Sequence, residues 1–402
     1  MSLLSLEDAQ REILALVQPG PPIQVALEEA AGLCVLSNVV APHPLPRFAN
    51  SSMDGYAVRR ADVEGSVQLR VVGEIRAGAG ADRPVGAGET MRIMTGAPLP
   101  SGADAVLPIE VAIENQGILE VQEVPELSYV RPAGDDIEAG AVAVEAGRPL
   151  GPGELALLAA LGADPIEVRS APHVAVITSG DELVAPAQEP GPGQIRDSNA
   201  VALSSLVREA NASVAVFARI HDDPDAVTAT LQTAAADAAL VLSAGGVSVG
   251  RHDYIREVVE RDGDVVLWRV AVQPGKPLLA GRVYGTPFIG LPGNPVSVHV
   301  GFEQFVRPAL RKMLGCRDVL RPVARAVLGE RMTKPSGRLH LVRVTLALDA
   351  GRLVATPTGP QGSHIQTSLV GCDGLVRFPA DLTELEAGAE VELEVWRLPS
   401  VL

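Results

Sequence analysis

The stretch Ser243-Ala244-Gly245-Gly246-Val247-Ser248-Val249-Gly250-Arg251-His252-Asp253 decides how this sequence is interpreted. It joins an apolar, strand-like run at 239–243 to a helical run at 254–261. Glycine tolerates positive φ and lets a ligand approach the backbone, and a helix N-terminus attracts anions. The sequence therefore predicts a phosphate-binding loop with contacts from Gly245, Gly246, Ser248 and Gly250. A tight turn that packs a helix on a strand is the alternative. A Walker A loop is excluded because Arg-His follows the last glycine instead of Lys-Ser/Thr.

Strand-like and helical runs alternate on both sides of this loop, across residues 171–315. That rhythm predicts an α/β fold with a parallel sheet covered by helices. Ligands of such sheets bind outside the carboxyl ends of the strands. Four polar loops are therefore expected at one edge of the sheet, at residues 178–182, 221–224, 243–253 and 291–297.

Three acidic residues come from three of these loops: Glu182, Asp222 and Asp253. Like charges at one edge repel unless a cation or a proton lies among them. Oxygen ligands beside a phosphate suit Mg²⁺, so we expect these carboxylates to bind it. A general base is the alternative role. Each acid taken singly is as consistent with a helix N-cap or a solvated charge, and Asp222-Asp223-Pro224 has the pattern of a cap.

Lys276 lies in the segment Gln273-Pro274-Gly275-Lys276-Pro277, where prolines restrict the backbone. An ammonium group positioned in this way could bind an anion, although an exposed lysine on a turn explains the pattern equally well. The last polar loop supplies further candidate substrate contacts, namely Pro292, Asn294, Pro295 and Ser297.

The segment Gly246-Val247-Ser248-Val249-Gly250 also matches Gly-x-Ser-x-Gly, the nucleophile elbow of serine hydrolases. Later histidines exist at His299, His340 and His364. However, no HGG-type oxyanion loop precedes the serine, which makes hydrolysis the weaker interpretation.

The remaining sequence predicts three further parts. Residues 1–46 and 132–170 contain helical stretches, among them 26–31 and 153–161, and form a helical, linking domain, interrupted by an inserted β-rich domain at 47–131. The α/β domain spans 171–316, and short β-type runs after Pro322 predict a C-terminal β domain at 317–402.

Composition restricts the possible partners. The chain has 402 residues, 47% of them hydrophobic, and a formal net charge of −16, which excludes wholesale disorder and argues against nucleic acid as a partner. Three widely spaced cysteines build neither a disulfide framework nor a CxxC metal site. The N-terminus lacks the pattern of a signal peptide, and no apolar run approaches 18 residues, so we expect a cytoplasmic protein without membrane contact.

Taken together, the motifs resemble one family: molybdopterin molybdenumtransferase, the MoeA and gephyrin E-domain family of molybdenum-cofactor biosynthesis. The resemblance covers nearly the whole chain. It rests on ten segments in the expected order: FANSSMDGYAV (48–58), GEI with AG (73–78), RIMTGAPLPSGAD (92–104), VRPAGDDI (130–137), TSGDEL (178–183), QIRDSN (194–199), the loop from Ser243 to Tyr254, PGKP (274–277), LPGNPVS (291–297) and GSH (362–364).

The resemblance implies an elongated homodimer of four-part subunits, with the α/β part related to molybdopterin adenylyltransferase. The implied reaction takes adenylylated molybdopterin and molybdate and releases AMP in a Mg²⁺-dependent step. The family's functional positions fall on Asp54, Thr95, Asp136, Glu182, Asp222, Asp253 and Lys276, with Pro292 and Pro295 shaping the last loop. Asp54 and Thr95 are expected to reach the site from the partner subunit.

Gln273 departs from the family pattern, which often has a lysine there. The resemblance leaves two alternative functions: the adenylyltransferase step itself, and a non-catalytic scaffold protein. Contact with a molybdopterin adenylyltransferase is also expected.

Overall fold

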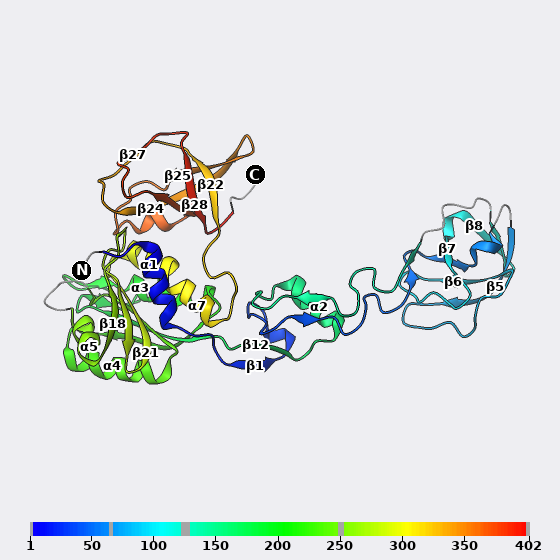
Figure 1. Cartoon of the computed structure of the whole chain (residues 1–402), viewed down its shortest axis with the longest axis horizontal. Coiled ribbons are helices and arrows are strands. Elements are labelled where there is room, and N and C mark those ends of the chain that lie inside the picture. Colours follow the sequence, from blue (N-terminus) through cyan, green and yellow to red (C-terminus); the bar gives the residue numbers. More distant parts are fainter. Residues whose placement is uncertain (1–2, 64–66, 122–128, 248–252, 399–402) are drawn as a thin grey trace.

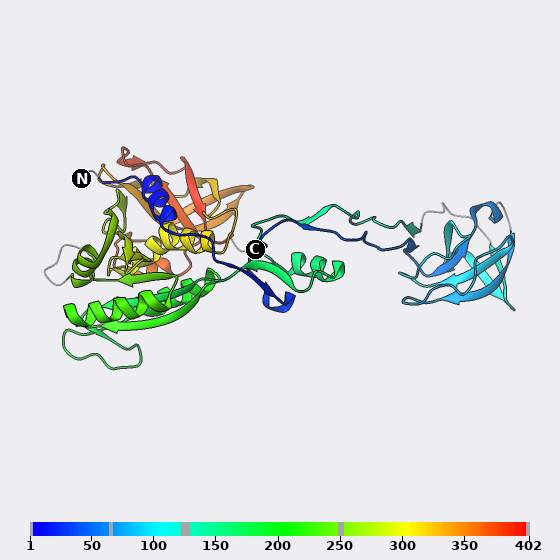
Figure 2. The same ribbon diagram turned by 60° about the horizontal axis from the view of Figure 1, so that its bottom comes forward.

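The computed structural model of the chain describes residues 3–63, 67–121, 129–247 and 253–398. Figures 1 and 2 show an elongated molecule in which an α/β part and a C-terminal β part lie against each other at one end. A slender linking part leads from them to a separate β-rich part at the far end. The α/β part and the β-rich part, which both contain many of the motifs, therefore lie far apart within one chain.

The α/β part is built on a six-stranded sheet in the order β16-β13-β17-β21-β20-β18. Four strands are parallel, as predicted: β13 (His173–Ser179), β16 (Ser213–Ile220), β17 (Leu240–Ala244) and β21 (Thr286–Leu291). Two antiparallel strands extend the sheet, β20 (Leu279–Val283) and β18 (Gly263–Trp268). A tight hairpin at Tyr284-Gly285, where both residues have positive φ, joins β20 to β21, and β18 pairs antiparallel with β20.

Helices cover both faces of this sheet. One face carries α3 (Ser198–Glu209), α6 (Pro295–Gly301) and α7 (Arg307–Met313), the last two joined by a π-helical turn at Phe302–Val306. The other face carries α4 (Pro224–Asp237) and α5 (Tyr254–Asp262). Each face buries its own apolar core, so the sheet is fixed from both sides and its strand ends are held rigidly.

The N-terminal helix α1 (Leu6–Leu16) packs on the α/β part. The sequence pattern had instead predicted that residues 1–46 belong to the linking domain. Leu6, Ala9 and Ile13 are buried in the same core as strands β13 and β17 of the α/β sheet. The physical reason is the apolar stripe of the helix, for which the α/β sheet offers an uncovered apolar surface. Ser5 caps the helix by accepting a hydrogen bond from Asp8 N at 3.0 Å.

The C-terminal part is a closed barrel of five strands. They are β22 (Val323–Leu328), β24 (Leu339–Asp349), β25 (Arg352–Pro357), β26 (Gly374–Phe378) and β28 (Glu390–Val395), closed by pairing of β24 with β26. A short pair, β23 (Met332–Thr333) and β27 (Glu384–Leu385), lies beside it. The two-residue strand β19 (Val272–Gln273) comes from the α/β part and pairs with β24. This pairing places the loop that contains Lys276 beside the barrel.

The linking part, residues 17–46 and 132–170, holds one small core and fewer helices than expected. It pairs β1 (Pro22–Val25) with β12 (Ile166–Arg169) and β2 (Val39–Val40) with β11 (Val142–Val144). Its helix α2 (Pro152–Leu161) agrees with the sequence pattern, whereas the predicted helix at 26–31 is only a 3₁₀ turn at Leu27–Glu29. The two chain segments of the linking part continue into a narrow neck, in which β3 (Asn50–Ser51) pairs with β10 (Val130–Arg131).

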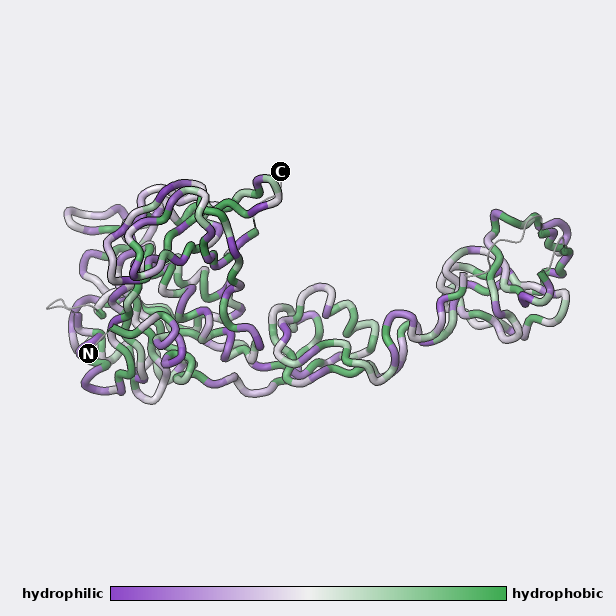
Figure 3. The backbone as a smooth tube through the Cα atoms, turned by 45° about the horizontal axis from the view of Figure 1, so that its top comes forward, coloured by the Kyte–Doolittle hydropathy of each residue, from purple (hydrophilic) through white to green (hydrophobic). Residues whose placement is uncertain are grey.

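The β-rich part beyond the neck is a six-stranded sheet in the order β7-β4-β6-β5-β9-β8. Its strands are β4 (Gly55–Val58), β5 (Val67–Ile75), β6 (Glu89–Ile93), β7 (Ala105–Pro108), β8 (Ala112–Asn115) and β9 (Ile118–Val121). Figure 3 shows short hydrophobic stretches interrupted by hydrophilic ones throughout the chain. In the described residues no helix is both long and apolar enough to cross a membrane.

Candidate functional site

A cleft of about 940 Å³ lies between the strand ends of the α/β sheet and the barrel. Its walls come from four segments: the loop after β13 with the start of α3, the Pro-Gly-Lys-Pro loop, the loop before α6, and the barrel loop 361–366 with Arg338. Among the predicted site residues, those that line it are Glu182, Lys276, Pro292, Asn294, Pro295 and Ser297. The expectation that ligand-binding loops gather at this sheet edge agrees with the position of the cleft.

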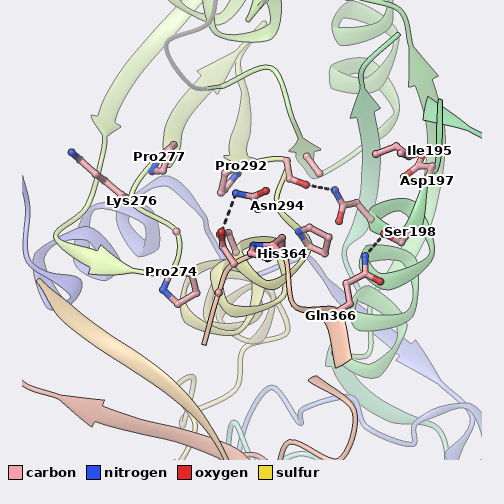
Figure 4. Close-up of a pocket in the computed structure, with 18 of the residues that line it drawn as sticks. Ile195, Asp197, Ser198, Pro274, Lys276, Pro277, Pro292, Asn294, His364 and Gln366 are labelled. Carbon is pink, nitrogen blue, oxygen red and sulfur yellow. Dashed lines mark hydrogen bonds between the residues drawn. The ribbon is translucent and has the colours of Figure 1, made fainter. Parts of the chain in front are cut away.

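Hydrogen bonds tie the barrel loop to the α/β part (Figure 4). Asn294 Nδ2 donates to Ser363 Oγ at 3.1 Å, and the backbone N–H of Val296 donates to Ser363 O at 3.1 Å. Across the cleft, Gln366 Nε2 donates to Ser198 Oγ at 2.7 Å. These bonds make the barrel loop a fixed wall of the cleft.

Arg343 supports this wall from inside the barrel. Its side chain is fully buried, and its Nε donates to Ser368 Oγ at 2.7 Å, while Nη2 donates to Gly362 O at 3.3 Å. The backbone N–H of Arg343 also donates to Gln361 Oε1 at 2.9 Å. Burial lowers the pKa of the guanidinium to about 10, so it stays charged near neutral pH. A buried cation therefore holds both ends of the loop that carries Ser363.

Asp197 holds the opposite wall. Its carboxylate is buried and accepts hydrogen bonds from Thr178 Oγ1 at 2.7 Å and from Ala200 N at 3.0 Å. Arg219 Nε lies 3.1 Å from the same carboxylate. The aspartate caps α3 and fixes Ser198 and Asn199, whose side-chain amide donates to Gly293 O at 2.8 Å.

The three predicted acidic ligands occupy different positions. Glu182 is exposed and lines the cleft. Asp222 accepts a hydrogen bond from Ser179 Oγ at 2.7 Å and does not line it. Asp253 is the N-cap residue of α5, at the edge of residues 248–252, which lie outside the described part. Within the described residues, no three His, Cys, Asp or Glu side chains are close enough together to hold a metal ion.

The glycine loop is described as far as Val247. Gly245 and Gly246 have φ of +91° and +67°, and a Cβ on Gly245 would lie 2.7 Å from the carbonyl oxygen of Ser179. Only glycine fits this turn without strain. Two of the four predicted phosphate contacts, Ser248 and Gly250, lie outside the described residues, and Ser248 is also the nucleophile of the hydrolase interpretation.

Lys276 lies on the side of the cleft opposite Asp197 and Gln366 (Figure 4). Its carbonyl accepts a hydrogen bond from Val270 N at 3.0 Å, and Gln273 in the preceding strand also lines the cleft. Two arginines also line the cleft, Arg338 from the barrel and Arg196, which is paired with Glu189. Besides the carboxylate of Glu182, the cleft therefore presents basic side chains and neutral hydrogen-bond donors, which suit an oxyanion.

Three predicted residues lie elsewhere. Asp54 and Thr95 belong to the β-rich part, where Asp54 Oδ1 accepts hydrogen bonds from Thr95 N and Thr95 Oγ1, both at 2.7 Å. These two bonds lower the pKa of Asp54, so its carboxylate is ionised near neutral pH. Asp136 is exposed beside the narrow connection, where its N–H donates to Leu45 O at 2.9 Å. None of the three lines the cleft of the same chain.

Sequence reasoning did not assign a role to Arg338, Arg343, Asp197, Ser198 or Gln366. The segments QIRDSN and GSH carried part of the family resemblance and were the available signal for two of the walls. The roles of Arg338 and Arg343 depend on which barrel residues lie next to the α/β sheet. The periodicity of a single strand does not reveal this.

The α/β part matches the family described as "Probable molybdopterin binding domain" over residues 175–312, which gives the class of this part of the chain. Residues 4–162 match "MoeA N-terminal region (domain I and II)", and residues 325–396 match "MoeA C-terminal region (domain IV)". The chain therefore belongs to the MoeA family, and the resemblance stated from its motifs is confirmed.

Relatives of full length support this assignment. Molybdopterin molybdenumtransferase 2 of Mycobacterium tuberculosis is 38% identical, over 98% of this chain and 99% of its own. Molybdopterin molybdenumtransferase of Haemophilus influenzae is 33% identical, over 98% of each chain. The crystal structure of the molybdopterin biosynthesis MoeA protein from Pyrococcus horikoshii is similar, with a TM-score of 0.83, 32% identity, and coverage of 98% of this chain and 100% of that chain.

Proposed function

We propose that this protein is a molybdopterin molybdenumtransferase. It would take adenylylated molybdopterin and molybdate, insert molybdenum into the dithiolene and release AMP. The observation that carries this proposal is the cleft of about 940 Å³, in which Glu182 and Lys276 face a common space between the α/β sheet and the barrel. Full-length relatives with that name support it.

The cleft residues have distinct roles in this proposal. Lys276 and Arg338 attract the molybdate dianion, because charge-assisted hydrogen bonds to an oxyanion are stronger than neutral ones. The hydroxyl of Ser297, the amide of Asn294 and the neighbouring prolines shape the space for the pterin. The protein acts mainly by positioning the two reactants, which converts a bimolecular encounter into a step within one complex.

Mg²⁺ is part of the proposal, with Glu182 as the carboxylate that would hold it in the cleft. A Mg²⁺ ion usually keeps several waters and needs only one or two carboxylates beside phosphate oxygens, so Glu182 is sufficient from this part of the chain. Asp253, at the start of α5, is the second candidate ligand. Asp222 is better suited to hold Ser179 in place, because its carboxylate accepts that hydroxyl. When bound, Mg²⁺ would withdraw charge from the pyrophosphate bond.

A homodimer completes the proposed site. Asp54 and Thr95 form an ordered pair in the β-rich part, which lies at the other end of the elongated molecule from the α/β part and the barrel (Figure 1). A two-fold assembly would bring each pair to the cleft of the partner. We also propose a cytoplasmic location, which suits the three free cysteines, and contact with a molybdopterin adenylyltransferase that supplies the nucleotide.

The test is release of AMP by the purified protein from adenylylated molybdopterin and molybdate, with and without Mg²⁺. We expect turnover only when all three components are present. Pyrophosphate formation from ATP and molybdopterin would instead identify an adenylyltransferase. Absence of any turnover in the presence of Mg²⁺ would contradict the proposal and favour a scaffold protein.

A further inference from the structure

Two of the three cysteines meet at the junction between the linking part and the α/β part. The Sγ atoms of Cys34 and Cys316 are 2.6 Å apart, although the residues are 282 positions apart in the sequence. Both are buried, with exposed fractions of 0% and 7%. Cys34 belongs to the linking part, where its carbonyl accepts a hydrogen bond from Arg169 N, and Cys316 follows helix α7. The pair therefore joins two structural parts instead of lying within one core.

Few other contacts hold this junction. Arg317 N donates to Gly147 O at 3.0 Å, and Gly20 N donates to Met313 O at 2.7 Å. The ion pair of Arg317 with Glu145 leaves both side chains about 60% exposed, and exposed ion pairs contribute little to stability. The apolar cluster at the junction is small and consists of the two cysteines and Leu314 with partly buried neighbours. A covalent link at this point would change the stability of the junction substantially.

The two thiols differ in acidity. The hydrogen bond between the two sulfurs, in which either can be the donor, and the nearby Arg311 and Arg307 lower the pKa of the Cys316 thiol. The same hydrogen bond, together with burial, raises the pKa of Cys34. The thiol with the lower pKa is the better candidate to attack an oxidant, and its neighbour is placed to resolve the product.

A pocket lies next to the pair, although neither cysteine lines it. This pocket of about 360 Å³ is lined by Pro149, which forms a β-bridge with Cys34, and by Arg317, which follows Cys316. The third cysteine differs from the pair: Cys372 is buried on its own in the barrel, donates to Gly374 O at 3.3 Å and has its pKa raised by burial.

We propose that Cys34 and Cys316 form a reversible disulfide on exposure to a peroxide, and that this bond ties the linking part to the α/β part. The Cys316 thiolate attacks one peroxide oxygen, the O–O bond breaks, and hydroxide leaves to give a sulfenic acid at Cys316. Cys34, losing its proton, attacks that sulfur, the S–S bond forms and the S–O bond breaks, releasing water. In sum, two thiols and one hydrogen peroxide give one disulfide and two waters, and a thiol reductant reverses the change.

The disulfide would also affect the proposed dimer. This consequence rests on the proposed function, whereas the formation of the disulfide does not. The junction sets the direction in which the linking part carries the β-rich part and its Asp54–Thr95 pair. A disulfide would restrict that direction and so fix how the pair meets the partner's cleft.

The test treats the purified full-length protein with hydrogen peroxide and maps its peptides by mass spectrometry without reduction. We expect two of three thiols to disappear, a cross-linked peptide containing Cys34 and Cys316 that is 2 Da lighter than the sum of its parts, and recovery of both thiols with dithiothreitol. A Cys372→Ser variant should give the same cross-link. Four results would each overturn the proposal: persistence of all three thiols, a disulfide to Cys372, a disulfide between two chains, or only sulfinic acid at Cys316.

Thermal unfolding provides a second measurement that compares each protein with itself. Oxidation should raise the Tm of the wild type by about 5 °C or more, because the bond closes a long loop in the unfolded chain. Cys34→Ser and Cys316→Ser variants should show no change in Tm between oxidised and reduced samples. An equal Tm for oxidised and reduced wild type would contradict the inference. These outcomes leave the AMP assay unaffected, so failure here is distinct from failure of the proposed function.

Discussion

The cleft and the Asp54–Thr95 pair are built in opposite ways. The cleft lies between two parts of the chain, and cross-links such as Asn294 to Ser363 and Gln366 to Ser198 hold its walls together. The Asp54–Thr95 pair depends on two hydrogen bonds between neighbouring loops of one sheet, and Asp54 is not buried. The cleft is thus a concave site that lacks the carboxylate of Asp54. The Asp54–Thr95 pair is an ordered, exposed carboxylate that does not line this cleft.

This difference fits the proposed two-fold assembly, in which the cleft and the Asp54–Thr95 pair would be two halves of one site. The two hydrogen bonds from Thr95 hold the Asp54 carboxylate in one orientation. The predictions below separate the contribution of the cleft from that of the remote pair, beginning with the change expected to have the greatest effect.

Glu182→Ala removes the exposed carboxylate of the cleft. We expect the rate of AMP release to fall by about 100-fold, since the loss of one preorganised electrostatic contact has an effect of this order. The exposed Glu167 in the linking part provides the matched control, and Glu167→Ala should keep the wild-type rate. A Glu182→Ala enzyme as fast as the wild type would remove Glu182 from the proposed site.

Lys276→Ala removes one of the two basic side chains expected to bind molybdate. The KM for molybdate should rise by about 10-fold, equivalent to about 1.4 kcal/mol, with a smaller change in kcat. Gln273→Lys adds a positive charge on the same wall and should lower that KM. Arg325→Gln, on the exposed outer surface of the barrel, serves as the control for a simple loss of charge. If Lys276→Ala lowers kcat alone, its role is not recruitment of the anion.

Thr95→Val keeps the shape of the side chain and removes one of the two donors to Asp54. We expect kcat near neutral pH to fall a few-fold, because the Asp54 carboxylate would keep only the backbone N–H of Thr95 as a donor. The pKa of Asp54 should rise towards its ordinary value, which moves the acid limb of the pH–rate profile to higher pH. Thr345→Val in the barrel is the control and should leave the profile unchanged. An acid limb that does not move would show that Asp54 does not control it.

Much of the α/β part could be predicted from its sequence. Buried parallel strands such as Val174–Ile177 read as continuous apolar runs, and the polar loops after them mark the edge where ligands bind. The family assignment likewise followed from motifs alone. Glu182 was predicted because its loop follows a parallel strand at the sheet edge, whereas Lys276 was predicted from the prolines that restrict its loop.

The rest depended on contacts between parts that a local pattern does not encode. Helix α1 has an apolar stripe, but the stripe does not reveal that it covers the α/β sheet. The buried Arg343 looks like an ordinary strand residue until the barrel closes around it. The contact between Cys34 and Cys316 joins residues that are 282 positions apart in the sequence, and no cysteine spacing pattern predicts it.

A mixed dimer tests the central claim most directly. Asp54→Ala and Glu182→Ala chains, each with its own affinity tag, are co-expressed, and the heterodimer is isolated by two successive purifications. Each homodimer should be nearly inactive in AMP release. The heterodimer has one cleft with an intact Glu182 facing an intact Asp54 from its neighbour, so it should recover about half of the wild-type activity. A heterodimer as inactive as both parents would mean that Asp54 and Glu182 do not act in one site shared between subunits.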